Sequence, residues 1–352
     1  MSLFSVGCTD GALTTTNTSS SLSSKVLVFA GLTTTAQNVT STTALYSTDS
    51  GAWTNTSAIP GVLPAYPAIT ILGNGKLLAA GGASTGALSD TNWFASVYNP
   101  STNTWTATAN MNKGRNQFGM TKLTNGNAIA VGGCSGGCIS PNAQVQTFAT
   151  VCQSAEIYDQ TLGTWTNTTA MVACRATTPA VVQLQNGNVL VCGGNNGASN
   201  LGTIQTYDSG TGTWTNQPSP TVKRKGPSVV LPDGRVVLVG GMTYAAGPNW
   251  GLSSAIDIFN PTTNTWSSGG NLQFARGYHQ VSLLNDGKIL ITGGLNGIAA
   301  NGTITSTTAT VEVYDPTTGK SSLPKLNGTR SFFRLANHPI IKKTPSNFFK
   351  GA

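Results

Sequence analysis

Charged side chains are scarce in this sequence, and acids are the scarcest of them. Asp, Glu, Lys and Arg make up 9% of the 352 residues, against about a quarter in an ordinary soluble domain. Hydrophobic residues reach 39%, so a packed core is possible, and Thr, Ser, Asn and Gly have to supply the polar surface. Such a surface is typical of proteins that work outside a cell, and we expect an extracellular or virion-surface location.

Other absences exclude whole classes of function. The net charge of +8 arises from 19 basic and only 11 acidic residues, without the Lys/Arg run that marks a nucleic-acid partner. No apolar run approaches the roughly 18 residues of a membrane span. The start, MSLFSVGCTDGALTTT, has neither the basic nor the apolar region of a secretory signal. An outside-type surface without a signal favours a virus or phage particle protein, released by lysis, over the mature form of a secreted bacterial protein.

Cysteine is also infrequent, but its placement is uneven. Of six residues, four fall within one stretch, at Cys134, Cys138, Cys152 and Cys174. The CSGGC segment is one residue too long for a redox C-x-x-C motif, and no second close pair or nearby histidine indicates zinc. Disulfides that tie down one long loop are favoured, while buried free thiols and a metal site stay open as alternatives. Disulfides would fit an oxidising location.

A repeat organises what the sequence does contain. A Gly-Gly pair after an apolar run occurs five times, as LLAAGG (77–82), AIAVGG (128–133), VLVCGG (189–194), VVLVGG (236–241) and ILITGG (289–294), and KVLVFAG (25–31) is a sixth copy with Ala for the first Gly. Each copy is followed by Tyr or Phe and then by Trp, at Tyr46 and Trp53, Tyr98 and Trp105, Tyr158 and Trp165, Tyr207 and Trp214, and Phe259 and Trp266; the last copy has Tyr314 with Lys320 in place of Trp. A period of about 50 residues predicts a repeat fold.

Two turn signals divide each repeat into four strands. Asn-Gly or Asp-Gly precedes five of the Gly-Gly strands, at 74–75, 125–126, 186–187, 233–234 and 286–287, and favours a two-residue type I′ hairpin turn. An Asx-Pro turn, as in YNPSTNTW at 98–105, separates the Tyr strand from the Trp strand. The unit is therefore a hairpin ending in Gly-Gly, a longer loop, and a second hairpin with Tyr and Trp.

These motifs resemble the kelch repeat over residues 25–341. The resemblance implies an all-β fold, a β-propeller of four-stranded antiparallel blades whose packing in a ring covers the sheets, and six copies predict a six-bladed ring. The first copy, 25–31, lacks a preceding hairpin partner, and we expect 329–341 to pair with it, so that N- and C-terminal strands share one blade. Residues 1–24 then form a Thr/Ser-rich arm and 342–352 a basic-aromatic tail, either of which would dock the ring onto other virion or surface proteins.

Arginine recurs in phase at the inner strand of five repeats, at Arg115, Arg175, Arg224, Arg276 and Arg330. This phase predicts a ring of positive charge around one mouth of the channel, suited to carboxylate, sulfate or phosphate ligands. The resemblance supports this, since arginine is common here in kelch domains, and in ubiquitin-ligase adaptors some such arginines resemble a grip for acidic peptides. The structural alternative is that each arginine bonds neighbouring backbone or the acid of the third strand.

The few acids and histidines follow the repeat as well. Glu156, Asp257 and Glu312 share one phase, two residues before Tyr or Phe. No carboxylate or histidine stands off the pattern as a general acid or base would, so we predict no catalytic residue. His279, three residues after Arg276, joins the candidate ligand-binding set. Galactose-oxidase relatives share the kelch propeller but need a copper cluster of His, Tyr and Cys that this chain does not offer, and we expect neither metal nor cofactor.

The loops after Gly-Gly are long and would lie on one face, at 83–92, 134–151, 195–202, 242–252 and 295–308. They carry Trp93, Tyr244 and Trp250 together with many Asn and Thr residues. This composition suits stacking on sugars and hydrogen bonding to their hydroxyls, with ordinary loop filler as the alternative. We therefore include these three aromatic residues among the candidate ligand-binding residues.

Taken together, the sequence favours a non-enzymatic binding or structural propeller, such as an adhesin or receptor-binding protein that recognises glycans or an acidic partner through its loops and an Arg-lined mouth. An enzyme alternative resembles the sialate mutarotases, bacterial kelch rings that bind an acidic sugar through arginine, and would need Glu156 or Glu312 beside an arginine at the mouth. A further alternative is a kelch protein-interaction adaptor inside the cell, which the low charge disfavours.

Overall fold

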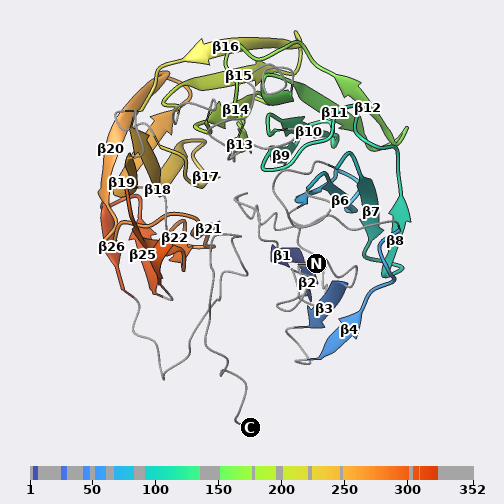
Figure 1. Cartoon of the computed structure of the whole chain (residues 1–352), viewed down its shortest axis with the longest axis horizontal. Helices are drawn as coiled ribbons and strands as arrows, with labels where there is room; N and C mark the ends of the chain where they lie inside the picture. Colours follow the sequence, from blue (N-terminus) through green and yellow to red (C-terminus); the bar gives the residue numbers. More distant parts are fainter. Residues whose placement is uncertain are drawn as a thin grey trace.

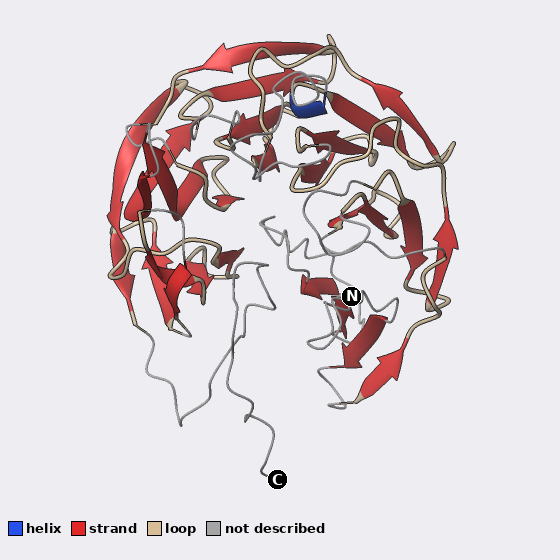
Figure 2. Ribbon diagram, in the orientation of Figure 1, coloured by secondary structure: helices blue, strands red, loops and turns tan. Residues whose placement is uncertain are grey.

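The chain is described by a computed structural model that covers residues 3–6, 25–29, 43–47, 52–60, 67–82, 92–134, 151–176, 179–195, 201–220, 224–245, 249–300, 304–308 and 310–323. Regular structure in these residues is β-strand, apart from one helical turn at 151–152 (Figure 2). Within the same residues, no helix has the length and apolar character needed to cross a membrane.

The strands form six four-stranded sheets that stand around a central axis (Figure 1). The first two consist of β1 (Leu3–Val6), β2 (Lys25–Phe29), β3 (Thr43–Ser47) and β4 (Trp53–Asn55), and of β5 (Ala68–Ile71), β6 (Leu77–Ala80), β7 (Ala95–Asn99) and β8 (Thr104–Ala107). The next two consist of β9 (Gly119–Lys122), β10 (Ala128–Val131), β11 (Ala155–Asp159) and β12 (Thr164–Asn167), and of β13 (Ala180–Gln183), β14 (Val189–Cys192), β15 (Ile204–Asp208) and β16 (Thr213–Gln217). The last two consist of β17 (Ser228–Val230), β18 (Val236–Ala245), β19 (Asn249–Asn260) and β20 (Thr265–Asn271), and of β21 (Gln280–Leu283), β22 (Ile289–Thr292), β25 (Val311–Asp315) and β26 (Lys320–Ser322), with β23 (Leu295–Ile298) and β24 (Ile304–Thr307) as a separate two-stranded ribbon.

Each sheet is a blade whose first strand lies near the axis and whose fourth lies on the rim (Figure 1). Neighbouring inner strands contact one another from β5 to β9, β13, β17 and β21. The second strands β6, β10 and β14 are buried along their whole length, because sheets cover them on both faces. The predicted all-β propeller architecture is confirmed.

The Gly-Gly pair ends the second strand because the backbone turns there through the left-handed region. Gly132 and Gly133 have φ angles of 68° and 84°, which residues with a Cβ disfavour. The pair also touches the next blade, since the Gly133 N–H donates to the Arg175 carbonyl at 2.9 Å and a Cβ on Gly132 would lie 2.5 Å from that oxygen. The same bond recurs in two other blades, from Gly82 to Arg115 and from Gly241 to Arg276.

The Asn-Gly hairpins form at the predicted places but with a different turn. Only the glycine has positive φ, 79° at Gly75, whereas a type I′ turn needs it at both central residues. The Leu72 carbonyl accepts from the Gly75 N–H at 3.1 Å, so the turn spans 72–75. The Asn74 Oδ1 accepts from the Lys76 N–H at 3.0 Å. The type I′ prediction was wrong. Asn is favoured at position 74 because its side chain accepts this hydrogen bond, and not because its backbone is left-handed.

The Tyr or Phe and the Trp of four repeats pack as a pair, and the Trp joins one blade to the next. The ring centroids of Tyr158 and Trp165 lie 5.1 Å apart, and both side chains are buried. Trp165 Nε1 donates to the Ala109 carbonyl, in the segment that leaves the preceding blade, at 2.9 Å, which satisfies the buried indole N–H. Equivalent bonds run from Trp214 to the Thr169 carbonyl at 3.0 Å and from Trp266 to the Pro218 carbonyl at 2.9 Å.

The blade that contains residues 25–29 is completed by a segment that we did not expect. β2 pairs with β1 in parallel, from Leu3 opposite Lys25 to Val6 opposite Val28, at the position predicted for 329–341. That pairing is corrected, because the open edge of β2 can accept any extended segment. Residues 7–24 are also long enough for the crossover that a parallel pair requires. The predicted arm thus contributes a strand to the ring, whereas 329–341 and the tail 342–352 lie outside the described residues.

Candidate functional site

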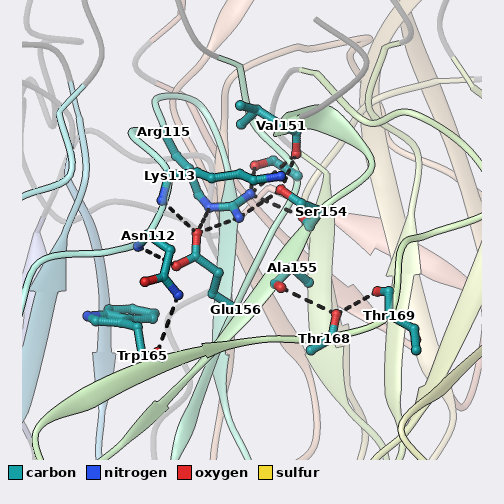
Figure 3. A network of polar contacts seen from close by, with 11 residues as sticks. Asn112, Lys113, Arg115, Val151, Ser154, Ala155, Glu156, Trp165, Thr168 and Thr169 are labelled. Atoms are coloured by element: carbon teal, nitrogen blue, oxygen red, sulfur yellow. Dashed lines mark hydrogen bonds and ion pairs between the residues drawn. The ribbon is translucent and has the colours of Figure 1, made fainter.

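Arg115 lies inside its blade with no exposed surface (Figure 3). Its Nε and Nη2 donate to Glu156 Oε1 at 3.1 and 2.7 Å, and its Nη1 donates to the carbonyls of Gly132 and Ser154 at 2.7 and 3.1 Å. Glu156 is equally buried and also accepts from the Asn112 N–H at 2.6 Å. Burial lowers the pKa of Arg115, and the charge of Glu156 opposes that shift. The guanidinium therefore joins the entry of the blade to its second and third strands.

Two further blades repeat this ion pair. Arg224 and Asp257 lie 2.6 Å apart, and Arg276 and Glu312 lie 2.5 Å apart, with all four residues buried. The predicted ring of positive charge around the channel mouth is therefore corrected. These guanidinium groups are desolvated and paired inside their blades. This agrees with the alternative that each arginine bonds the acid of the third strand. Arg330 lies outside the described residues.

Arg175 differs from the other buried arginines, because its blade has Gln205 at the strand position of Glu156. Arg175 Nη1 donates to the Gly193 carbonyl at 2.6 Å, and no carboxylate of the described residues pairs with it. Burial lowers the pKa of Arg175 to about 10. With its amide oxygen toward the preceding turn, Gln205 accepts from the Val172 N–H at 3.0 Å. Gln205 thus keeps the backbone contact of Glu156 without its charge.

His279 is also inside the structure and not on the mouth. The residue is 1% exposed, and a Cβ on Gly240 would lie 3.0 Å from its Cε1. Burial, together with the nearby charge of Arg276, lowers the pKa of His279 to about 3. The ring is therefore neutral and packed, and its expected place in a ligand site is corrected.

The cysteines join two blades. A disulfide joins Cys152, which lies just before β11 in the β9–β12 blade, to Cys174, which lies in the segment that enters the β13–β16 blade. Cys134 is disulfide-bonded as well, and it packs in one buried cluster with Cys152. Cys192 is a buried free thiol whose pKa burial raises to about 11, and Cys138 lies outside the described residues. Three or more His, Cys, Asp or Glu residues placed to hold a metal ion do not occur in the described part of the chain.

One face of the ring carries structure beyond the repeat. Because the second, third and fourth strands of a blade alternate in direction, the Gly-Gly ends and the connections between blades share this face, which we call the Gly-Gly face. Here β18 and β19 continue past Gly241 as a hairpin whose pairing extends to Ala245 and Asn249. The β23–β24 ribbon contacts β19, and the Trp250 N–H donates to the Ala300 carbonyl at 3.0 Å. The hairpin is thereby fixed to the neighbouring blade.

Lys225 lies beside this hairpin and is 7% exposed. Its backbone exchanges two hydrogen bonds with Met242, at 3.0 and 2.8 Å. Its Nζ donates to Tyr278 Oη at 3.1 Å and lies 4.9 Å from the centre of the Tyr278 ring and 5.7 Å from the centre of the Trp250 ring. Both ring distances fall within the range of cation–π attraction. We call these three residues the lysine cluster.

Comparison with known proteins agrees with this architecture. The Kelch motif family matches residues 176–221, 223–273 and 276–323. Beta-scruin of Limulus polyphemus is 29% identical over 142 residues, 40% of this chain and 15% of that protein. An F-box/kelch-repeat protein of Arabidopsis thaliana is 30% identical over 89 residues, 25% of this chain and 29% of that protein. The chain is a kelch-repeat β-propeller.

Two solved structures align with this kelch propeller over most of its length. A fungal alcohol oxidase of the AA5 family, solved in complex with copper, matches with a TM-score of 0.65 and 19% identity, over 86% of this chain and 63% of that chain. The structure of YjhT matches with a TM-score of 0.62 and 16% identity, over 81% of this chain and 91% of that chain. At these identities the likeness concerns the fold alone. Against the two sequence relatives, the kelch propeller spans 15% and 29% of their lengths.

Of the three aromatic loop residues that the sequence predicts as ligand-binding, two lie at the lysine cluster or beside it. Trp250 belongs to the cluster, and Tyr244 is its register partner in the hairpin, while Trp93 is 58% exposed in a different blade. Sequence reasoning missed Lys225 and Tyr278. A signal was available, because Lys225 directly follows a repeated arginine at a position where the other copies carry Asn, Ala, Gly or Ser.

Proposed function

We propose that this kelch propeller is a non-enzymatic recognition or structural protein of a virion or an extracellular surface, and that it binds glycans or an acidic partner through its Gly-Gly face. The observation that carries the proposal is the β18–β19 hairpin, which brings Trp250 to Lys225 and Tyr278 on that face. Trp93 lies at the same end of its blade, since the carbonyl of its neighbour Phe94 accepts from the Gly81 N–H at 2.8 Å. Exposed Trp and Tyr rings combine apolar area with a polar tip, which suits ligand recognition.

The internal use of the acids supports a non-enzymatic role. Glu156, Asp257 and Glu312 are buried in ion pairs with arginine, and His279 is buried and neutral. These three carboxylates and this histidine are thus enclosed in the propeller, where the carboxylates brace their blades. Recognition then falls to the hairpin and the loops, because the arginines are paired inside their blades.

A glycan array and a set of acidic peptides, probed with the full chain, test the proposal. Trp93→Ala should weaken binding at least tenfold for ligands that contact its blade. Leu162→Ala is the matched control, because Leu162 is 74% exposed in the β11–β12 turn on the opposite face, and it should change nothing. If the folded protein bound neither ligand class, recognition would be excluded and only the structural role would be left.

Two alternatives rest on likenesses of fold or sequence. A carbohydrate-active enzyme, such as a sugar-acid mutarotase, is the first alternative, because a propeller of this fold also occurs in an enzyme, the fungal alcohol oxidase. NMR exchange between the anomers of N-acetylneuraminate tests it, and acceleration by the protein would replace our proposal. An adaptor role is favoured by the partial match to the F-box/kelch-repeat protein, and it predicts peptide binding without glycan binding.

A further inference from the structure

We propose that the lysine cluster is the binding site for the carboxylate of an acidic saccharide. This inference rests on the proposed function and names the site and the ligand class. The buried Arg115, Arg224 and Arg276 each have a carboxylate partner. In the described part of the chain, no carboxylate forms an ion pair with Lys225, although that residue is buried as well.

Among the described residues, the ammonium group of Lys225 has a single hydrogen-bond acceptor, which leaves donors for a ligand. An ammonium has three donors, and Tyr278 Oη takes one of them at 3.1 Å. The two aromatic faces offset part of the lost hydration, but a buried cation without an anion is still costly. Because the bond to Tyr278 is only part-buried, an oxygen from outside can approach. A carboxylate would supply both the opposite charge and the acceptors.

The cluster is held in place before any ligand arrives. Gly277, the residue before Tyr278, has no room for a side chain, since a Cβ would lie 2.6 Å from Met242 Cγ. The hairpin therefore packs directly on the segment that carries Tyr278. Tyr278 also has a φ of 50°, a left-handed conformation that a residue with a Cβ adopts only when its surroundings hold it there. With Trp250 anchored on Ala300, little conformational freedom is left to lose on binding.

The shape of the cluster favours a saccharide over an acidic peptide. One ammonium lies within cation–π range of two aromatic rings, and this matches one carboxylate attached to a sugar ring. The C–H groups of a pyranose can pack on Trp250, and its hydroxyls can bond to Tyr278 Oη. A run of acidic side chains would instead require several cations along a groove, and the lysine cluster contributes only one.

Calorimetric titration with matched sugars tests this site. The ligands are D-glucuronate and N-acetylneuraminate, each compared with its methyl ester, which keeps the ring and removes the charge. We expect each acid to bind wild-type protein at least tenfold more tightly than its ester, and to bind less tightly as salt is raised. Lys225→Met should remove that tenfold difference, and Tyr278→Phe should reduce it about threefold. Lys76→Met, next to a hairpin turn on the opposite face, is the control and should bind as wild type does.

Equal binding of acid and ester to wild-type protein would overturn the inference, as would unchanged binding by folded Lys225→Met. If that variant failed to fold, the ester comparison and the salt dependence of wild-type protein would still decide. Neutral glycans bound on the array without any sugar acid would contradict this site and leave the proposed function standing. Binding of acidic peptides alone, lost in Lys225→Met, would contradict the saccharide assignment.

Discussion

The guanidinium of Arg115 and the carboxylate of Glu156 lie 2.7 Å apart, and neither side chain has any exposed surface. Each is also bonded to backbone groups, Arg115 to the Gly132 carbonyl and Glu156 to the Asn112 N–H. The pair thus ties the segment that enters the blade to strands that come later in the chain. The recurrence of arginine in the sequence reflects this internal bracing.

Replacing one partner of the pair should destabilise the propeller strongly. In Glu156→Gln the amide can still accept from Asn112, but Arg115 becomes a buried cation without an opposite charge. We expect a loss of about 3–5 kcal/mol of unfolding free energy, measured by urea denaturation at pH 7. Arg115→Met should cost a similar amount, because it leaves Glu156 buried and unpaired.

A double-mutant cycle separates the pair from its surroundings. Arg115→Met combined with Glu156→Gln should lose much less than the sum of the two single losses, since no charge is then left uncompensated. Additive losses would show that the two side chains stabilise the blade independently, and would contradict the bracing role.

Adding a carboxylate beside Arg175 should have the opposite effect. Gln205→Glu would keep the acceptor for the Val172 N–H and supply the charge that the other blades have. Because the guanidinium is already desolvated, we expect a gain of about 1.5–3 kcal/mol, the usual range for hydrogen bonds to charged groups. The shift of the urea midpoint measures it. Gln185→Glu, at an exposed turn, is the control for added charge, and an equal shift there would refute the explanation.

The repeat made most of the fold predictable, since its signals are local and occur several times. Gly-Gly, Tyr and Trp recur in phase because each residue is needed for the same contact between neighbouring blades, as Gly133 and Trp165 show. The turn type was not predictable from Asn-Gly alone, because the decisive bond runs from the Asn74 side chain to a residue beyond the turn. The strand Leu3–Val6 carries no repeat signal, and any extended segment could have filled that edge.

The site was harder to predict, because the sequence does not show which way a side chain points. Arg115 and Lys225 both lie in segments that enter an inner strand, yet the first is enclosed by its own blade and the second lies beside two aromatic rings. The position of Glu156 within the repeat did indicate that it could be the partner of Arg115. Nothing in the repeat indicates the partners of Lys225, since Trp250 comes from an extension of the β18–β19 hairpin beyond the repeat.

The Cys152–Cys174 bond should stabilise the junction between two blades. The two cysteines are separated by 22 positions, and closing a loop of this size is worth about 2–4 kcal/mol. We expect the Cys152→Ser/Cys174→Ser double variant to lose that amount in urea denaturation under non-reducing conditions. Cys192→Ser, which changes a buried free thiol outside the bond, controls for lost packing. A loss in the double variant no larger than in Cys192→Ser would contradict an effect of the cross-link.

His279 should make the propeller less stable in mild acid. Its pKa is lowered to about 3 in the folded protein, against about 6.5 in an unfolded chain. Below pH 6.5 the unfolded state therefore binds a proton that the folded state does not, so stability falls as pH is lowered from 6.5 toward 3. The slope reaches about 1.4 kcal/mol per pH unit once the unfolded ring is fully protonated.

Urea denaturation at pH 7, 6 and 5 measures this effect in a range where the carboxylates stay ionised. The His279→Gln variant, which cannot gain a proton, should be less stable at pH 7 because of lost packing but should show a flatter dependence on pH. The difference between the two slopes isolates His279 from every other titrating group, including His338. Parallel curves for the variant and the wild-type protein would mean that the ring reaches solvent, and that the packing of His279 against Gly240 does not exclude its proton.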